Sequence, residues 1–174
     1  ATFLQAVNAL FFSLRFKVGR FLMPIHLVGL NKIGKGAHFS APIMKRAWKD
    51  LMKILITGGT GSLGKTVTRL LKDNHTICIF SRNESRQAEF PYDTEKAVGD
   101  VRDFDRIDYV MKRFRPDWVF HFASNKRIPE MEWYPDEAVK TNILGSQNLC
   151  RAADKHNIER CIFTSTDKAC QPVN

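Results

Sequence analysis

The sequence has few of the residues that build metal centres, disulfide frameworks or membrane spans. Its four cysteines, Cys78, Cys150, Cys161 and Cys170, form no C-x-x-C pair, and its five histidines form no cluster at metal-ligand spacing. No stretch reaches 18 uncharged apolar residues, so we expect no transmembrane span. Three of the cysteines lie in apolar runs, where a cysteine usually acts as a small hydrophobe. We therefore predict reduced thiols, no metal site and a cytoplasmic location.

Acidic residues are nearly missing from the first 50 positions, which hold eight Lys and Arg but one acid, Asp50. Residues 51–174 hold 19 basic and 17 acidic side chains, so the net charge of +9 lies mostly in the N-terminal segment and does not predict a nucleic-acid partner. We expect residues 1–51 to be an irregular basic and apolar extension of unknown role. The alternative, an interfacial helix over residues 1–30, would reach a membrane surface. The sequence begins with Ala, which suggests Met52 as the natural start and a foreign leader before it.

Three spaced glycines, by contrast, follow a short apolar run in residues 53–64, Lys-Ile-Leu-Ile-Thr-Gly-Gly-Thr-Gly-Ser-Leu-Gly. The apolar run predicts a strand and the spacing of residues 65–72 predicts a helix, so the glycines form the turn between them. Gly58 can adopt a turn geometry closed to other residues, Gly61 lets the backbone approach a pyrophosphate, and Gly64 lets helix and strand pack closely. Because a helix N-terminus offers free N–H groups to an anion, we predict a dinucleotide site here.

Two other interpretations of this stretch exist. Residues 59–66 also satisfy the P-loop pattern, but that pattern needs a Mg²⁺-binding carboxylate at the end of another strand, and nothing downstream favours one over a dehydrogenase. A glycine-rich loop can also simply turn the chain. The spacing of Thr57, Gly58, Gly61 and Gly64 resembles instead the fingerprint of extended short-chain dehydrogenase/reductases.

Strands and helices alternate after residue 52, which predicts a parallel sheet wound right-handedly. We expect an α/β fold over residues 52–174, a Rossmann-type doubly wound parallel sheet that is incomplete, with about five strands. Asp103 is a fair N-cap for one helix and Pro135 a first residue for another. The strands are predicted at residues 53–57, 76–81, 96–99, 118–123 and 160–164, and the helices at residues 62–72, 82–90, 104–114 and 135–156.

The end of the second predicted strand indicates the type of nucleotide. Residues 81–83, Ser-Arg-Asn, stand where a chain that prefers NAD usually places an acid for the ribose 2′-hydroxyl, and Arg82 would attract a 2′-phosphate. This favours NADP, with NAD as the alternative. By the resemblance, Asp100 accepts a hydrogen bond from adenine and residues 121–124 line the nicotinamide ribose, although His121 could equally be a satisfied core histidine. The predicted cofactor-binding residues are Thr57, Gly58, Thr60, Gly61, Ser62, Leu63, Gly64, Ser81, Arg82, Asp100, Val101, Phe122, Ala123, Ser124 and Asn142.

The last predicted strand brings a hydroxyl, an acid and an amine to its carboxyl end, beside the predicted cofactor site. This stretch is Ser165-Thr166-Asp167-Lys168-Ala169. Together with residues 99–103, 126–129 and 137–142, it resembles the nucleotide-sugar 4,6-dehydratases of the polysaccharide-biosynthesis branch, which are similar to UDP-N-acetylglucosamine 4,6-dehydratase. The similarity covers residues 53–174.

The resemblance implies a redox-neutral lyase acting on a UDP-sugar. NADP takes hydride from C4 of the sugar, a proton leaves C5 and water leaves C6, and hydride returns to C6. Mapped here, Thr166 hydrogen-bonds the C4 oxygen, Asp167 assists departure of the C6 hydroxyl and Lys168 removes the C5 proton. A free lysine titrates near ~10.4, so desolvation or nearby positive charge must lower the pKa of Lys168. A plain surface Asp-Lys pair is the alternative. Lys126 resembles a substrate-binding position.

Three functions stay open. The first is the dehydratase, the second is a nucleotide-sugar epimerase or reductase, which the Thr-Asp-Lys triplet disfavours, and the third is a non-catalytic NADP-binding module. In the family, the Tyr, or in some members Met, and the Lys of a Tyr-x-x-x-Lys pattern would follow Asn174, and further strands and a sugar-binding domain would come after them. We therefore expect this chain to be an N-terminal fragment with little or no turnover, and the complete enzyme to be a homo-oligomer.

Overall fold

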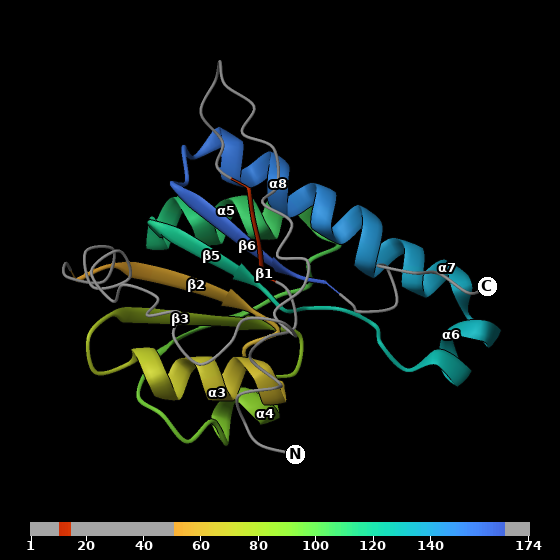
Figure 1. Cartoon of the computed structure of the whole chain (residues 1–174), viewed down its shortest axis with the longest axis horizontal. Coiled ribbons are helices and arrows are strands. Elements are labelled where there is room, and N and C mark those ends of the chain that lie inside the picture. Colours follow the sequence, from red (N-terminus) through yellow and green to blue (C-terminus); the bar gives the residue numbers. More distant parts are fainter. Residues whose placement is uncertain (1–10, 15–50, 166–174) are drawn as a thin grey trace, which may run out of the picture.

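A six-stranded sheet forms the centre of the computed structural model, which describes the backbone of residues 11–14 and all of residues 51–165 (Figure 1). The order across the sheet is β1-β6-β5-β2-β3-β4, with β1 antiparallel at one edge and the other five strands parallel. The predicted parallel sheet of about five strands is confirmed, and four residues of the extension that we expected to be irregular add the edge strand. The strands are β1 (Phe11–Leu14), β2 (Lys53–Thr57), β3 (Thr76–Ser81), β4 (Glu95–Val98), β5 (Trp118–His121) and β6 (Arg160–Thr164).

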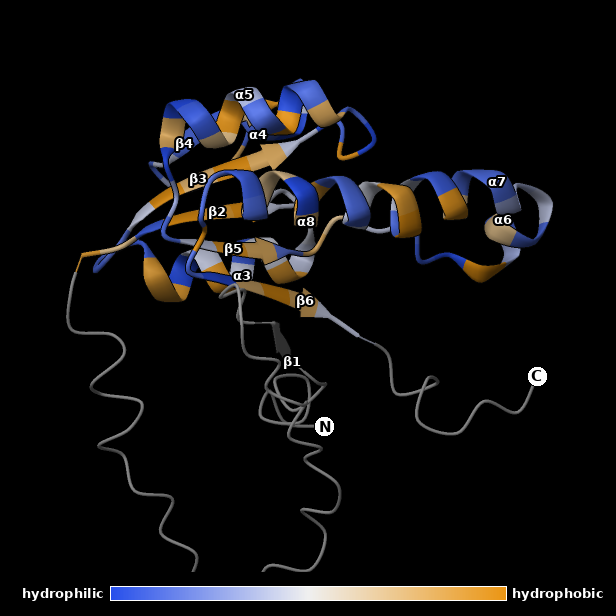
Figure 2. Ribbon diagram, turned by 90° about the horizontal axis from the view of Figure 1, so that it is seen from above, coloured by the Kyte–Doolittle hydropathy of each residue, from blue (hydrophilic) through white to orange (hydrophobic). Residues whose placement is uncertain are grey.

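Helices cover both faces of the sheet, as a doubly wound fold requires (Figure 1). Successive strand residues point to opposite faces, so Leu55 packs with Met111 and Leu149 on the side of α5 and α8. Its neighbour Ile54 packs with Leu71 on the side of α3. Figure 2 shows hydrophobic residues along the strands and hydrophilic residues on the outer helix surfaces. The helices are α3 (Ser62–Leu71), α4 (Glu84–Ala88), α5 (Phe104–Phe114), α6 (Ile128–Trp133), α7 (Pro135–Ala138), the π-helical η2 (Val139–Leu144) and α8 (Gly145–Lys155).

The helix starts are set by local capping. Asp103 caps α5 as predicted, because its side chain accepts a hydrogen bond from the Arg106 N–H at 2.9 Å. The helix predicted over residues 82–90 starts at Glu84, since the Asn83 side chain accepts from the N–H of Arg86 at 2.8 Å and caps α4. Short polar caps therefore fix two of the boundaries that position the cleft described below.

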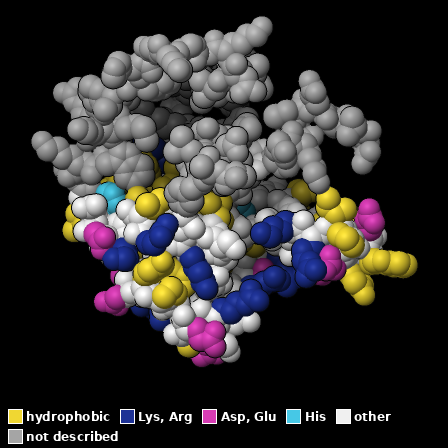
Figure 3. All heavy atoms as spheres, turned by 60° about the horizontal axis from the view of Figure 1, so that its bottom comes forward, with side chains coloured by type: hydrophobic (Ala, Val, Ile, Leu, Met, Phe, Trp, Pro, Cys, Tyr) yellow, Lys and Arg dark blue, Asp and Glu magenta, His cyan; other side chains and the backbone are white. Residues whose placement is uncertain are grey.

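The helix predicted over residues 135–156 contains a π-helical turn that the sequence did not predict. Its segments α7, η2 and α8 follow one another directly, and the N–H of Gly145 donates to the carbonyl of Lys140, five residues earlier. The short helix α6 was also missed. Figure 2 shows α6 and α7 projecting beyond the sheet, and hydrophobic side chains gather at that end in Figure 3. Trp133 in α6 is 82% exposed.

The described cysteines are free thiols within the core or at its edge. Cys78 and Cys161 are buried, and burial raises the pKa of both thiols to about 12. Cys150 is also free and half-buried, and Cys170 lies outside the described residues. No described helix is long and apolar enough to cross a membrane, and within residues 51–165 no group of His, Cys, Asp and Glu is arranged to hold a metal ion. The division of the chain at residues 51 and 52 stays a prediction.

Candidate functional site

An open cleft of about 320 Å³ lies at the carboxyl edge of the sheet. It lies where the strand order reverses, because the chain passes from β2 to β3 on one side and later returns to β5 on the other. The strand ends Thr57 and His121 are direct neighbours there. In open α/β sheets, ligands bind in this crevice. The cleft is lined by Gly58, Thr60, Gly61, Ser62, Leu63, Gly64, Phe80, Ser81, Arg82, Asn83, Arg86, Gly99, Asp100, Val101, Phe122, Ala123, Ser124, Lys126 and Thr141.

The turn between β2 and α3 forms one wall of the cleft and is built from backbone. Gly58 has a φ of 66°, in the left-handed region that favours glycine, and its N–H donates to the carbonyl of Phe80 at 2.9 Å. A Cβ on Gly58 would lie 2.7 Å from the backbone nitrogen of Ala123. A Cβ on Gly64 would lie 2.6 Å from the Cα of Gly59. These contacts leave no room for side chains, so glycine alone permits this turn.

The first turn of α3 presents backbone donors to the cleft. The first intrahelical hydrogen bond runs from the Lys65 N–H to the Gly61 carbonyl at 2.9 Å, so the N–H groups before it have no partner within the helix. These belong to Ser62, Leu63 and Gly64, which all line the cleft. The first turn of α3 also contains no acidic residue. Together with the positive end of the helix dipole, this arrangement suits a phosphate or pyrophosphate.

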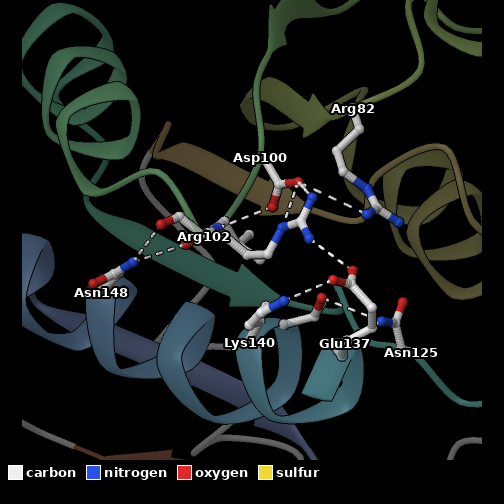
Figure 4. A network of polar contacts seen from close by, with 9 residues as sticks. Arg82, Asp100, Arg102, Asn125, Glu137, Lys140 and Asn148 are labelled. Atoms are coloured by element: carbon white, nitrogen blue, oxygen red, sulfur yellow. Dashed lines mark hydrogen bonds and ion pairs between the residues drawn. The ribbon is translucent and has the colours of Figure 1, made fainter. Parts of the chain in front are cut away.

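Charged side chains build the facing wall (Figure 4). Asp100 follows β4, and its carboxylate accepts from the backbone N–H and the Nε of Arg102, both at 2.9 Å. The Arg82 guanidinium lies 3.7 Å from the same carboxylate. Partial burial works to raise the pKa of Asp100, but hydrogen bonds from Arg102 and the charges of both arginines hold it below its ordinary value. The predicted contact from Asp100 to adenine therefore has to share a carboxylate that Arg102 already engages.

Arg102 joins this wall to the helical segments beyond it. Its Nη1 lies 2.8 Å from the Glu137 carboxylate in α7, and Glu137 also pairs with Lys140 at 3.2 Å. The side chain of Asn148 in α8 donates to the Arg102 carbonyl at 3.0 Å. The loop between β4 and α5 is thus held by both α7 and α8 (Figure 4). On the face that Figure 3 brings forward, Lys and Arg side chains gather in a band with Asp and Glu beside it.

All but two of the predicted cofactor-binding residues line the cleft, and so does Lys126, the predicted substrate-binding residue. Of the two exceptions, Thr57 is buried at the end of β2. The other, Asn142 in η2, accepts from the N–H of Asn125 at 2.8 Å and donates to the Asn125 carbonyl at 2.9 Å. Asn125 stands between two cleft-lining residues, so Asn142 supports the cleft through its neighbour.

Some cleft-lining residues were not among those predicted to bind cofactor. Arg86 could have been predicted from the sequence, because it lies four residues after Arg82 in the predicted helix and hence on the same helix face. Thr141 lies within residues 137–142, which contributed to the family resemblance, but the π turn that brings it to the cleft was not predicted. Phe80, Asn83 and Gly99 complete this group.

His121 is a hydrogen-bonded core histidine and does not line the cleft. It is 5% exposed, with Nδ1 2.7 Å from the hydroxyl of Thr57 and Nε2 3.0 Å from the hydroxyl of Ser146. The ring of Phe163 packs against it edge-on at 5.2 Å. Burial lowers the pKa of His121 to about 4, so the ring is neutral at pH 7. Of the two possibilities that the sequence left open, the satisfied core histidine is the one observed.

The predicted catalytic residues Thr166, Asp167 and Lys168 lie outside the described residues. The strand before them is placed, because β6 runs parallel to β5 with Phe163 beside His121. The chain therefore leaves β6 at the same edge of the sheet as the cleft. The roles of the three residues stay predictions.

Residues 54–174 match a family described as "Polysaccharide biosynthesis protein". The chain is 44% identical over 129 residues to a UDP-N-acetylglucosamine 4,6-dehydratase (inverting) of Campylobacter jejuni subsp. jejuni serotype O:23/36 (strain 81-176). It is 42% identical over 132 residues to a UDP-glucose 4-epimerase of Rickettsia bellii (strain OSU 85-389). Each match covers 70% of this chain and 38% of the relative, so the chain spans about two fifths of the length of these relatives.

The fold has matches among solved structures as well. A UDP-glucose 4-epimerase from Bifidobacterium longum, in complex with NAD+ and UDP, superposes with a TM-score of 0.60 and 26% identity, covering 68% of this chain and 38% of that one. The family match covers more than half of the chain and includes the glycine turn, both walls of the cleft and the predicted catalytic triplet. The chain therefore belongs to the polysaccharide biosynthesis protein family.

Proposed function

We propose that this chain forms the dinucleotide-binding part of a nucleotide-sugar 4,6-dehydratase that acts on a UDP-N-acetyl-hexosamine in polysaccharide or glycan biosynthesis. The observation that carries the proposal is the glycine turn at the reversal of strand order, in a chain 44% identical to a UDP-N-acetylglucosamine 4,6-dehydratase. The oxygens of a pyrophosphate on the first turn of α3 would accept hydrogen bonds from the backbone N–H groups of Ser62, Leu63 and Gly64. The substrate and activity of the whole protein are part of the proposal.

The residues present fit a nicotinamide dinucleotide, and their charges favour NADP. Arg82 and Arg86 line the end of the cleft beside β3, while Asp100 is the one acid among the lining residues. That carboxylate is engaged by Arg102, so it adds little repulsion toward a 2′-phosphate. NAD is the alternative, because the solved epimerase relative binds NAD+.

The chain's own residues would handle the protons and position the sugar. When bound, the dinucleotide supplies a hydride acceptor and donor for the sugar carbons. We assign Thr166 to a hydrogen bond with the C4 oxygen, Asp167 to protonation of the departing C6 hydroxyl, and Lys168 to removal of the C5 proton. Lys126, which lines the cleft, would contact the substrate.

A second candidate is a nucleotide-sugar epimerase, favoured by the 42% identity to a UDP-glucose 4-epimerase. The two reactions require different acid and base groups from the chain. An epimerase returns hydride to the carbon that lost it and expels no water, so it needs no acid at C6 and no base at C5. The residues that separate the candidates are therefore Asp167 and Lys168.

Product analysis of the whole protein tests the catalytic assignment. With UDP-N-acetylglucosamine, a dehydratase gives a product lighter by one water, whereas an epimerase gives a product of unchanged mass. Lys168→Met should lower the dehydration rate by about a thousandfold, because it removes the base. Lys155→Met is the matched control, since Lys155, the last residue of α8, is exposed and pairs with Asp108 of α5. Full activity of Lys168→Met would refute the assignment.

Calorimetric titration of the chain with NADP and NAD tests the binding assignment. Arg82→Ala should weaken NADP binding by about tenfold and NAD binding by less than about twofold, because only NADP carries the 2′-phosphate. Equal weakening would exclude Arg82 as the residue that prefers NADP. If the unmodified chain bound neither dinucleotide, the proposed function would fall.

A further inference from the structure

A buried line of polar side chains runs behind the cleft and joins three elements. Thr57 ends β2, His121 ends β5, and Ser146 lies in the first turn of α8. Thr57 and His121 are 1% and 5% exposed, so their polar atoms need partners within the protein. The hydroxyl of Thr57 lies 2.7 Å from His121 Nδ1, and that of Ser146 lies 3.0 Å from His121 Nε2. Beyond Ser146 the line reaches the Asn142 carbonyl, to which the Ser146 hydroxyl donates at 2.7 Å.

Counting donors along this line fixes the tautomer of the imidazole. The Ser146 hydroxyl has one proton and gives it to the Asn142 carbonyl, which can only accept. Ser146 must therefore accept from His121, which places the ring proton on Nε2. A neutral imidazole carries one N–H, so Nδ1 accepts from the Thr57 hydroxyl. The Thr57 oxygen in turn lies 3.4 Å from the N–H of Ala123, a residue of the cleft wall.

The line continues from Asn142 to the cleft. Asn142 lies in the π turn, and its side chain makes two hydrogen bonds to the backbone of Asn125, at 2.8 and 2.9 Å. The Asn125 side chain donates to the Glu137 carbonyl at 3.1 Å and to the Thr141 hydroxyl at 3.2 Å. Asn125 stands directly before Lys126, which lines the cleft. Side chains of Asn125 and Ser146 thus hydrogen-bond to Thr141 and Asn142 within the π turn.

We infer that His121 is a positioning residue: as the Nε2–H tautomer, it couples the end of β2 to the π turn and, through Asn142, fixes the segment that carries Lys126. The inference rests on the proposed function in taking the cleft as the dinucleotide site. Direct contact with a ligand is not part of this role, since His121 does not line the cleft.

Nitrogen NMR of the histidine rings in the full chain tests the tautomer. His121 should show a protonated Nε2 and an unprotonated Nδ1 at neutral pH. His121→Gln assigns the signal by removing it. Its amide nitrogen reaches the Nε2 position, so the hydrogen bond to Ser146 is kept. A protonated Nδ1 at pH 7 would overturn the inference.

Amide exchange tests the coupling without reference to catalysis. Ser146→Ala removes the acceptor for His121 and the donor for the Asn142 carbonyl, so the Asn125 amide should exchange about tenfold faster. The Gly58 amide, which bonds to Phe80, should change less than about twofold. Ser146→Thr restores the hydroxyl and should restore slow exchange at Asn125. Equal acceleration at both amides, or none at Asn125, would overturn the inference.

Dinucleotide binding separates this inference from the proposed function. If the unmodified chain binds NADP, Ser146→Ala should weaken that binding by about fivefold and Ser146→Thr should recover it. If the unmodified chain binds neither NADP nor NAD, the proposed function fails, and the exchange rate of Asn125 still decides whether His121 positions the segment.

Discussion

One wall of the cleft is formed by backbone atoms and the other by charged side chains. On one side, Gly58 and Gly64 shape a turn of backbone without side chains, in which an added Cβ would lie 2.8 Å or less from neighbouring backbone atoms. On the other side, Asp100, Arg102 and Glu137 form a chain of ion pairs whose side chains are 22–38% exposed. The first wall requires that Gly58 and Gly64 have no side chain, so we expect it to tolerate almost no substitution at these two positions. The second depends on partly solvated charges, each of which contributes modestly.

The largest effect should come from adding a side chain to the backbone wall. Gly58→Val would force a β-branched residue into a φ of 66° and its Cβ against Ala123, so we expect about 4 kcal/mol less stability and loss of dinucleotide binding. Urea denaturation and NADP titration measure the two effects. Gly61→Ala is the control. Its φ is −74° and its Cβ would meet only the Gly58 carbonyl at 3.1 Å, so it should lose far less stability. Equal losses would break the comparison.

Acid should lower the stability of the protein through His121, the buried neutral histidine that hydrogen-bonds with Thr57 and Ser146 behind the cleft. His121 has a pKa of about 4 when folded and an ordinary value of 6.5, so the unfolded chain binds the extra proton between these pH values. The contribution of the neutral His121 to the free energy of unfolding is complete above pH 6.5. About 3 kcal/mol of it is lost as the pH falls toward 4. The groups that face it, Thr57, Ser146 and Phe163, do not titrate in this range.

Urea denaturation at several pH values measures this loss. Burial also lowers the pKa of His75, which contributes in the same direction. His121→Gln should therefore flatten the dependence of the unfolding free energy on pH without abolishing it. An unchanged slope in that variant would show that His121 is not the titrating group.

The smallest effect should come from the charged wall. Arg102→Ala removes the link between Asp100 and Glu137, and we expect a loss of about 1 kcal/mol, because Arg102 is about a third exposed. The pKa of Asp100 should rise toward its ordinary value, since Arg102 donates the hydrogen bonds that lower it. Thermal denaturation and NMR titration of Asp100 measure both. Arg151→Ala, which removes a cation over the Phe104 ring, should leave Asp100 unchanged. A loss as large as that of Gly58→Val would contradict the distinction between the walls.

The backbone wall could be predicted from the sequence, whereas most of the charged wall could not. Glycine spacing predicts a turn from neighbouring residues alone, because a turn without room for side chains must consist of glycines. Short apolar runs likewise predicted β2, β3 and β6 at their observed limits. Arg102 gave no comparable signal, since its partner Glu137 is 35 residues away and its role depends on the tertiary fold.

The π turn escaped prediction for a related reason. The sequence of residues 135–156 has helical character throughout, and the inserted residue becomes visible only through the bond from Gly145 to Lys140. The support that Asn142 gives to Asn125 follows from this geometry and could not be predicted, and the assignment of Asn142 to the cofactor stays a prediction. The triplet Thr166, Asp167 and Lys168, the cytoplasmic location and the oligomeric state stay predictions.

The hydrogen bond from Gly58 to Phe80 makes the anion cradle dependent on a neighbouring strand. The cradle therefore has no shape of its own until β2 and β3 have paired, and a chain with a melted sheet has nothing to offer a dinucleotide. A ligand that recognises only the assembled state shifts the folding equilibrium by mass action. If the cleft binds a dinucleotide as proposed, the free energy of unfolding of this chain should rise with the concentration of that dinucleotide.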